Sequence, residues 1–158
     1  MRKANREITD FDEIVGVMQD CDVCRLALNG PDGTPYIVPL NFGMAVDGNA
    51  VALYFHSALE GLKLDLIRRD DRAAFEMDCK HQLLPSEEGC SCSFAYESVM
   101  GSGTISLVDG DEKVRGLDLI MDHYHMGENA HYNPAVVQRT AVYRLDVRTI
   151  TGKRNVPK

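Results

Sequence analysis

The sequence lacks an excess of basic residues. Its 158 residues include 17 Lys or Arg and 24 Asp or Glu, which gives a formal net charge of −7 and a pI near 5.1. The phosphate backbone of a nucleic acid and the surface of an anionic membrane attract basic patches and repel an acidic surface. The charge balance therefore argues against nucleic acid and membrane as partners.

The sequence also lacks long apolar runs. No stretch approaches the roughly 20 apolar residues that a membrane helix needs, and residues 1–13 are charged and then amphipathic, unlike a signal peptide. We therefore expect a cytoplasmic protein. With 13 glycines and six prolines, the composition is neither disordered nor collagen-like. The length predicts a single domain over residues 1–158, with a sizeable core.

The cysteines lack the even number of a disulfide framework. Five cysteines in a chain without an export signal predict free thiols. Cys21-x-x-Cys24 has no partner pair of matching spacing, so we expect no zinc or iron–sulfur site there. A thiol sensor is a separate hypothesis, and it would involve Cys21, Cys24, Cys79, Cys90 and Cys92.

Local patterns predict a chain of strands with three inserted helices. Asp10 and Glu13 form a capping box that predicts a helix to Gln19, and apolar spacing predicts further helices over 57–67 and from Asp111. Alternating apolar residues and turn signals predict the strands. They are expected at residues 24–29, 34–46, 50–56, 73–80, 94–109 and 140–147, with a loop over 83–93.

The strand pattern favours a curved antiparallel sheet. Pro39 cannot donate a backbone hydrogen bond to a neighbouring strand, so it is expected at an edge or a bulge. Gly101 and Gly103 are typical of a bend in a long strand, and no third glycine makes them a dinucleotide-binding motif. Because closure removes exposed edges, we expect six strands closed into a small barrel with helices outside.

The stretch YFHSALEGLKLDLI, residues 54–67, passes from strand to helix at His56-Ser57. Ser57 and Glu60 match a capping box, and the start of a helix attracts anions. Lys63 leans back toward the same point, so a phosphate would fit there. The alternative is that Ser57 and Glu60 merely cap the helix and Lys63 is a solvated surface residue.

Three histidines, His123, His125 and His131, lie at and beyond the end of the third predicted helix. Positions i and i+2 do not face one way on a helix, so we expect no metal site there. No Ser/His/Asp arrangement or carboxylate pair supports hydrolysis.

Four motifs taken together resemble a known superfamily. They are PYIVPLNFGM (35–44), LYFHSALEGLKLDLIRRDDRAAFEMD (53–78), YESVMGSG (96–103) and ITGKR (150–154). In this order they resemble the flavin-binding split-barrel superfamily of the pyridoxamine 5'-phosphate oxidase type, and in particular its nitroimidazole-resistance (Nim) branch. The implied fold class is mainly β (α+β), a six-stranded antiparallel split β-barrel with flanking helices.

The resemblance implies a homodimer that binds FMN at the subunit interface, without a metal. Residues Val38, Pro39, Leu40 and Asn41 would run beside the flavin ring, and Ser98, Val99 and Gly101 would form another wall. His56, Ser57 and Lys63 would hold the phosphate or lie beside it, and His56 is the candidate catalytic residue. A substrate-clamping set like that of true pyridoxamine phosphate oxidases is absent, so vitamin B6 chemistry is not expected.

The implied activity is that of an FMN-dependent reductase. Reduced nicotinamide or another donor would supply electrons, and small acceptors such as nitroaromatics would receive them. The alternative is a non-catalytic flavin- or haem-binding module, with His123, His125 and His131 as the residues to watch for haem ligation.

Overall fold

The computed structural model describes residues 4–88, 91–127 and 131–156. These residues contain an eight-stranded sheet with helices around it. The strands are β1 (Glu7–Ile8), β2 (Cys24–Asn29), β3 (Pro35–Leu40), β4 (Gly43–Asp47), β5 (Ala50–Ala58), β6 (Arg72–Leu84), β7 (Ser93–Val108) and β8 (Thr140–Asn155). The helices are the short η1 (Ala4–Arg6), α1 (Phe11–Gln19), α2 (Leu62–Arg69), α3 (Gly110–His123) and α4 (Pro134–Gln138).

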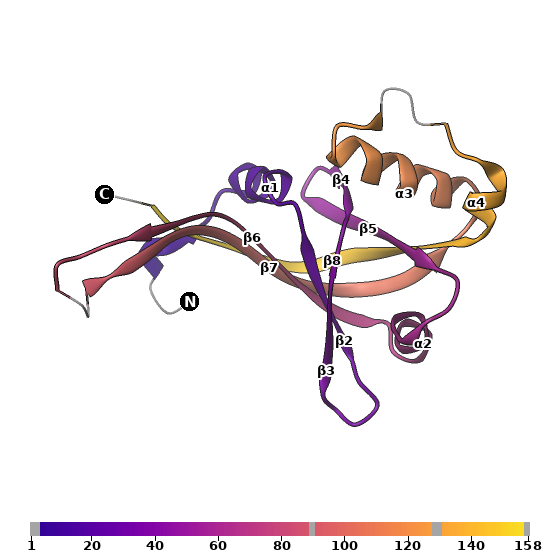
Figure 1. Ribbon diagram of the computed structural model, residues 1–158, viewed down its shortest axis with the longest axis horizontal. Coiled ribbons are helices and arrows are strands. Elements are labelled where there is room, and N and C mark those ends of the chain that lie inside the picture. The colour runs from indigo at the N-terminus through magenta and orange to yellow at the C-terminus, as the bar shows by residue number, and fades with distance from the viewer. Residues whose placement is uncertain (1–3, 89–90, 128–130, 157–158) are drawn as a thin grey trace.

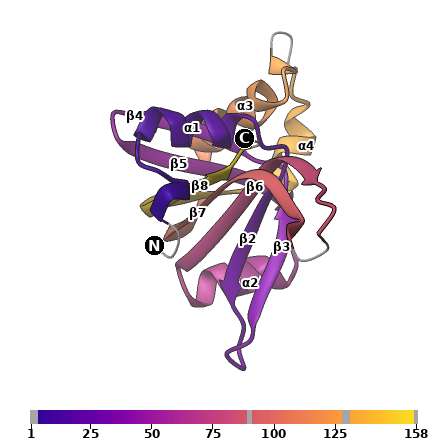
Figure 2. The ribbon, with the colours of Figure 1, turned by 90° about the vertical axis from the view of Figure 1, so that its left-hand side faces the viewer.

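The sheet is antiparallel and strongly curved. Its strands follow the order β3-β2-β6-β7-β8-β5-β4, and β1 pairs with the end of β8. In the view of Figure 1, α1, α3 and α4 lie above the long strands and α2 lies below them. Figure 2 shows α2 beside the β2–β3 hairpin, at the opposite end of the molecule from α3. The predicted mainly β fold, with antiparallel strands and flanking helices, is confirmed.

Two details of the predicted barrel need correction. The sheet is not closed, because β3 and β4 are the two ends of the strand order and do not pair with each other. The expected strand 34–46 divides into β3 and β4 at Asn41-Phe42, which together with the short β1 gives eight strands rather than six. The division has a local cause, since Phe42 is fully buried and its backbone N–H donates to the hydroxyl of Tyr124 at 3.3 Å instead of to a strand.

The bend predicted at Gly101 and Gly103 is present. The pairing of β7 with β8 shifts register between Ser102 and Gly103. A Cβ on Gly103 would lie 2.0 Å from the carbonyl oxygen of Asp146, so the backbones of the two strands approach too closely for a side chain.

The predicted start of α2 was wrong. The helix begins at Leu62, its N-cap is Gly61 with φ 135°, and no side chain caps it. Ser57 is still part of β5, where it pairs with Ala141 of β8, and its hydroxyl donates to the carbonyl of Ala58 at 2.9 Å. The capping box of Ser57 and Glu60 therefore does not form, because the strand continues to Ala58. By contrast, the cap of α1 is confirmed, since Asp10 accepts a hydrogen bond from the N–H of Glu13 at 3.0 Å.

Two apolar clusters stabilise the sheet on its two faces. The larger cluster fills the concave side, where α1 and α2 contribute Val17, Met18, Leu64 and Ile67. The smaller one lies between α3 and the outer face of β5 and β8, and includes Ile120. In the described ranges, no helix is long and apolar enough to cross a membrane.

Candidate functional site

His56 and Ser57 are consecutive residues at the end of β5, and their side chains face opposite sides of the sheet. Side chains alternate between the faces of a strand. Phe55 belongs to the larger core and Tyr54 to the smaller core under α3, which places His56 on the α3 side and Ser57 on the inner side. This orientation of His56 agrees with its surroundings, because His56 and Leu117 of α3 line the same cavity.

Ser57 lies near a buried hydroxyl that has no hydrogen-bond partner. Tyr143 of β8 is completely buried, and its Oη makes no hydrogen bond. Burial raises the pKa of Tyr143, and Ser57 of β5 and Tyr36 of β3 lie close enough to influence that pKa. Buried polar groups without a hydrogen-bond partner are uncommon, so each one calls for a structural or functional explanation. An unpaired donor is therefore present near Ser57 of β5 and Tyr36 of β3.

Lys63 lies in the first turn of α2 and close to His56. Partial burial lowers the pKa of His56, and the positive charge of Lys63 lowers it further. The imidazole is consequently neutral at pH 7 and can donate or accept a hydrogen bond. The predicted group of His56, Ser57 and Lys63 thus does gather at the end of β5, but Ser57 faces away from His56.

Residues Val38 to Asn41 divide between the two faces of the edge strand β3. Val38 and Leu40 are half-buried and pack against the larger core, whereas Pro39 and Asn41 are exposed. Pro39 has no N–H, and that of Phe42 is bound to Tyr124. Any ligand beside this segment therefore meets the exposed side chains of Pro39 and Asn41 first.

The candidate residues on β7 lie apart from the others within one chain. Strands β2 and β6 separate β7 from β3. Val99 is fully buried in the larger core, and Ser98 is half-buried on the opposite face. A Cβ on Gly101 would lie 2.4 Å from the carbonyl oxygen of Thr149 and 2.5 Å from the ring of Phe75, so this glycine serves close packing.

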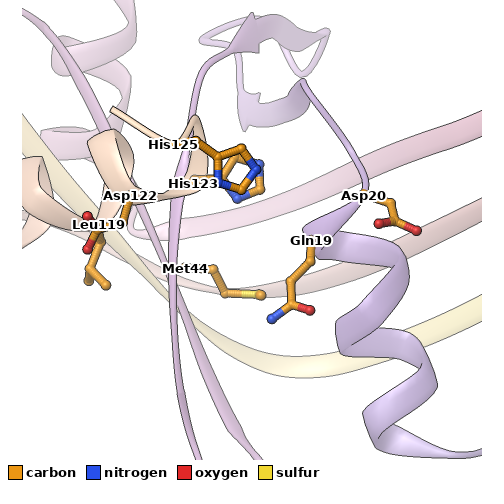
Figure 3. Close-up of a pocket in the computed structure, with 7 residues that line it drawn as sticks. All are labelled: Gln19, Asp20, Met44, Leu119, Asp122, His123 and His125. Atoms are coloured by element: carbon orange, nitrogen blue, oxygen red, sulfur yellow. The ribbon is translucent and has the colours of Figure 1, made fainter. Parts of the chain in front are cut away.

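The three histidines do not gather at one point. His123 packs against Phe42 with ring centroids 4.1 Å apart, and its Nε2 lies 2.9 Å from the carbonyl oxygen of Cys21. Figure 3 shows His123 and His125 at a pocket of about 400 Å³ formed by α1, β4 and the end of α3. His131 lines the other cavity, with His56. Among the described residues, no cluster of three or more His, Cys, Asp or Glu is placed to hold a metal ion.

The described cysteines are free thiols. Cys21 and Cys24 are buried, Cys79 is half-buried beside Cys21, and Cys92 is exposed. Burial raises the pKa values of Cys21 and Cys24, which disfavours the reactive thiolate. Cys90 lies outside the described residues.

The sequence patterns did not identify two tyrosines near His56. The patterns predict Tyr143 only as part of an alternating strand, and they do not place Tyr132. The signal for Tyr143 was its inward position between the apolar residues of TAVYRLDV, where a hydroxyl needs a partner. Tyr132 follows α3 in a segment without periodicity, so no pattern could place it.

Comparison with known families assigns this fold. The model of the family described as pyridoxamine 5'-phosphate oxidase matches residues 10–154. The chain belongs to this pyridoxamine 5'-phosphate oxidase family. Members of the family bind flavins. Comparison with curated proteins gives no match.

Three solved structures are similar to this member of the family. A candidate 5-nitroimidazole antibiotic resistance protein from Bacteroides thetaiotaomicron has a TM-score of 0.81 and 31% identity, over 94% of this chain and 86% of that one. The FAD and heme binding protein from Mycobacterium smegmatis has a TM-score of 0.84 and 20% identity, over 96% and 74% of the two chains. Flavocytochrome Anf3 from Azotobacter vinelandii has a TM-score of 0.82 and 16% identity, over 99% and 72%. The last two likenesses show the fold alone.

Proposed function

We propose that this protein is a homodimeric, cytoplasmic, FMN-binding oxidoreductase that reduces small acceptors such as nitroaromatics with electrons from reduced nicotinamide. The observation that carries the proposal is the buried hydroxyl of Tyr143, which has no hydrogen-bond partner and lies near Ser57 and Tyr36 on the inner side of the sheet, while Lys63 and His56 lie at the same end of β5. This arrangement occurs in a family that binds flavins, which supports the cofactor. The free and buried thiols of this chain, Cys21 and Cys24, suit a reducing compartment, which supports the cytoplasmic location.

The residues at the end of β5 fit the phosphate of FMN. A phosphate monoester needs a cation and several hydrogen-bond donors. Lys63 supplies the charge from the first turn of α2, where the helix dipole also favours an anion. On the inner side the hydroxyl of Tyr143 would supply a donor, whereas the hydroxyl of Ser57 already donates to the carbonyl of Ala58 and His56 faces the other side of the sheet.

The edge strand β3 fits the flavin ring. Pro39 presents an exposed ring without a polar N–H, which suits contact with a flat aromatic face, and Asn41 presents an exposed amide beside it. In the bound state, the isoalloxazine ring supplies the electron transfer, and the protein positions and tunes it. Asn41 would donate where negative charge gathers on the reduced ring, and this stabilises the reduced form.

A second copy of the chain would cover the outer face of β3, β2, β6 and β7. One register row across this face contains Ile37, Ala27, Ala74 and Ser102, and the next contains Pro39, Arg25, Glu76 and Met100, in which Arg25 and Glu76 form an ion pair at 2.9 Å. Ile37 is 62% exposed and Met100 is 51% exposed. Exposed apolar side chains on a sheet face mark an interaction surface.

Helix packing leaves this face free. In the part of the chain that the structure describes, α1 and α2 contribute to the core on the opposite side of these strands, and α3 packs on β4, β5 and β8. A partner copy bound to this outer face would bring its own strands beside the Pro39–Asn41 segment. Of the three β7 candidates, only Ser98 faces this outer side and would belong to the wall that the partner supplies, because two strands separate β7 from β3 within one chain and Val99 and Gly101 face the core.

The proposal is tested first by the absorption spectrum of the purified protein and by titration of FMN. We expect bands of oxidised flavin, or quenching of FMN fluorescence on addition of the flavin-free protein, with one FMN per chain. Oxidation of reduced nicotinamide in the presence of 4-nitrobenzyl alcohol then tests the activity. The absence of flavin binding would refute the cofactor, and flavin binding without turnover would refute the enzyme in favour of a non-catalytic flavin module.

A further inference from the structure

A second cavity lies on the other side of His56 from the proposed phosphate site. It has a volume of about 410 Å³ and lies between the end of β5, α3, α4 and the start of β8. An apolar cavity of about 150 Å³ holds a benzene molecule, and ligand pockets generally begin at about 300 Å³. The cavity is therefore large enough for a ligand of one or two rings.

The walls of this cavity are mainly apolar. Leu117 of α3 and Val136 and Val137 of α4 supply aliphatic side chains. Val136 is 51% exposed although it lines the cavity, so its apolar surface remains in contact with solvent unless a ligand covers it. An occupant with an apolar body would gain free energy by covering this surface.

Two polar side chains at the cavity already have partners. Asn133 accepts a hydrogen bond from the N–H of Ala135 at 3.0 Å and thereby caps α4. The hydroxyl of Thr140 donates to the carbonyl of Val136 at 2.9 Å. These contacts hold α4 in place and leave the two side chains less available to a ligand.

Tyr132 and His56 are available instead. The hydroxyl of Tyr132 is buried and makes no hydrogen bond, although Asp118 is nearby. Burial first, and then Asp118, raise the pKa of Tyr132 to about 12, so this hydroxyl keeps its proton and acts as a donor at pH 7. His56 is neutral at the same pH because burial and Lys63 lower its pKa. The cavity therefore presents a neutral hydroxyl and a neutral imidazole, and His131 also lines it.

We propose that this cavity binds a small uncharged aromatic molecule, whose oxygen accepts a hydrogen bond from Tyr132 and whose ring lies between Val137 and His56. This binding does not rest on the proposed function, because every group that makes it belongs to the end of β5, α3, α4, the α3–α4 connection and the start of β8. Tyr132 and Val137 are then the residues that select this ligand.

The test is calorimetric titration of the whole protein with 4-nitrobenzyl alcohol, with FMN bound and with FMN removed. We expect saturable binding with a Kd of about 1 mM or tighter, which a ligand of this size reaches at ordinary ligand efficiency. Tyr132→Phe removes only the hydroxyl and should weaken binding about threefold to tenfold. Val137→Phe fills the cavity and should weaken it at least about tenfold.

Tyr96→Phe is the matched control, because Tyr96 is half-buried on β7, away from the cavity. It should bind the probe as the wild type does. Circular dichroism and the melting temperature check that each variant is folded. Unchanged affinity in Tyr132→Phe, or no saturable binding by the wild type, would overturn the inference. If FMN fails to bind but the probe still binds in a Tyr132-dependent way, only the proposed flavin function falls.

Discussion

His56 and Lys63 form a coupled pair at the junction of β5 and α2, where the charge of Lys63 adds to partial burial in lowering the pKa of His56. The two residues come from different elements, a strand that ends at Ala58 and a helix that begins at Leu62. Gly61 makes their approach possible, since its φ of 135° turns the chain sharply just before the helix. The pair places the ammonium group of Lys63 near a neutral imidazole at one end of the candidate site.

The lowered pKa of His56 predicts a pH dependence of stability. Folded His56 binds a proton less readily than in the unfolded chain, where its pKa is about 6.5. The unfolded state therefore binds more protons as the pH falls through and below that value, and the free energy of unfolding decreases. At pH values well above 6.5, His56 is neutral in both states, and its contribution to the free energy of unfolding is fully present. Urea titrations at pH 7.5 and pH 5 should show a smaller loss of stability in His56→Gln than in the wild type. An equal loss in both would contradict the prediction.

Replacing Lys63 should weaken FMN binding. A hydrogen bond to a charged group contributes about 1.5–3 kcal/mol, so Lys63→Ala should raise the Kd for FMN about tenfold to a hundredfold. Fluorescence quenching of FMN measures it. Lys113→Ala on α3 is the matched control, because Lys113 is similarly half-buried on another helix. An equal rise in the Kd for FMN in both variants would indicate only a general effect of charge.

Short-range patterns predicted the elements that local chemistry determines. Asp10 and Glu13 did mark the start of α1, because a cap depends on residues three positions apart. Ser57 and Glu60 have the same pattern, yet Ser57 stays in β5 because it pairs with Ala141, which is 84 positions away along the sequence. Tertiary pairing overrides a local cap, and a single segment does not reveal that pairing.

The candidate site was likewise predictable only where its residues are close in the sequence. His56 and Lys63 do come together, because only the last two residues of β5, the turn 59–61 and Leu62 separate them. The Oη of Tyr143 joins this region only through the pairing of β8 with β5, and Tyr132 reaches the cavity only through the packing of α3 and α4. Both contacts depend on residues distant in sequence, which hydrophobic periodicity does not encode.

Substitution by alanine should have opposite effects at two glycines, one where β7 closely approaches β8 and the other inside α1. Gly103→Ala places a Cβ against the carbonyl of Asp146, and overpacking of this kind costs about 1–3 kcal/mol. Gly16→Ala lies inside α1 with no atom within 4 Å of the new Cβ, so better helix propensity should stabilise the protein by about 0.5–1 kcal/mol. Urea midpoints measure both. A stabilised Gly103→Ala would show that the strands separate more readily than the bend implies.

The outer face of β3 predicts how the protein assembles. A charge at Ile37 would be buried without a partner in a dimer that uses this face, so Ile37→Asp should yield monomers where the wild type forms dimers. Size-exclusion chromatography with light scattering measures the mass, and Val46→Asp, on the exposed side of β4, is the matched control that should stay dimeric. If FMN lies between the copies, Ile37→Asp should also lose FMN affinity in proportion to the dimer lost. A wild-type monomer that binds FMN fully would place the flavin within a single chain, whereas a dimer that survives Ile37→Asp would place the interface on another face.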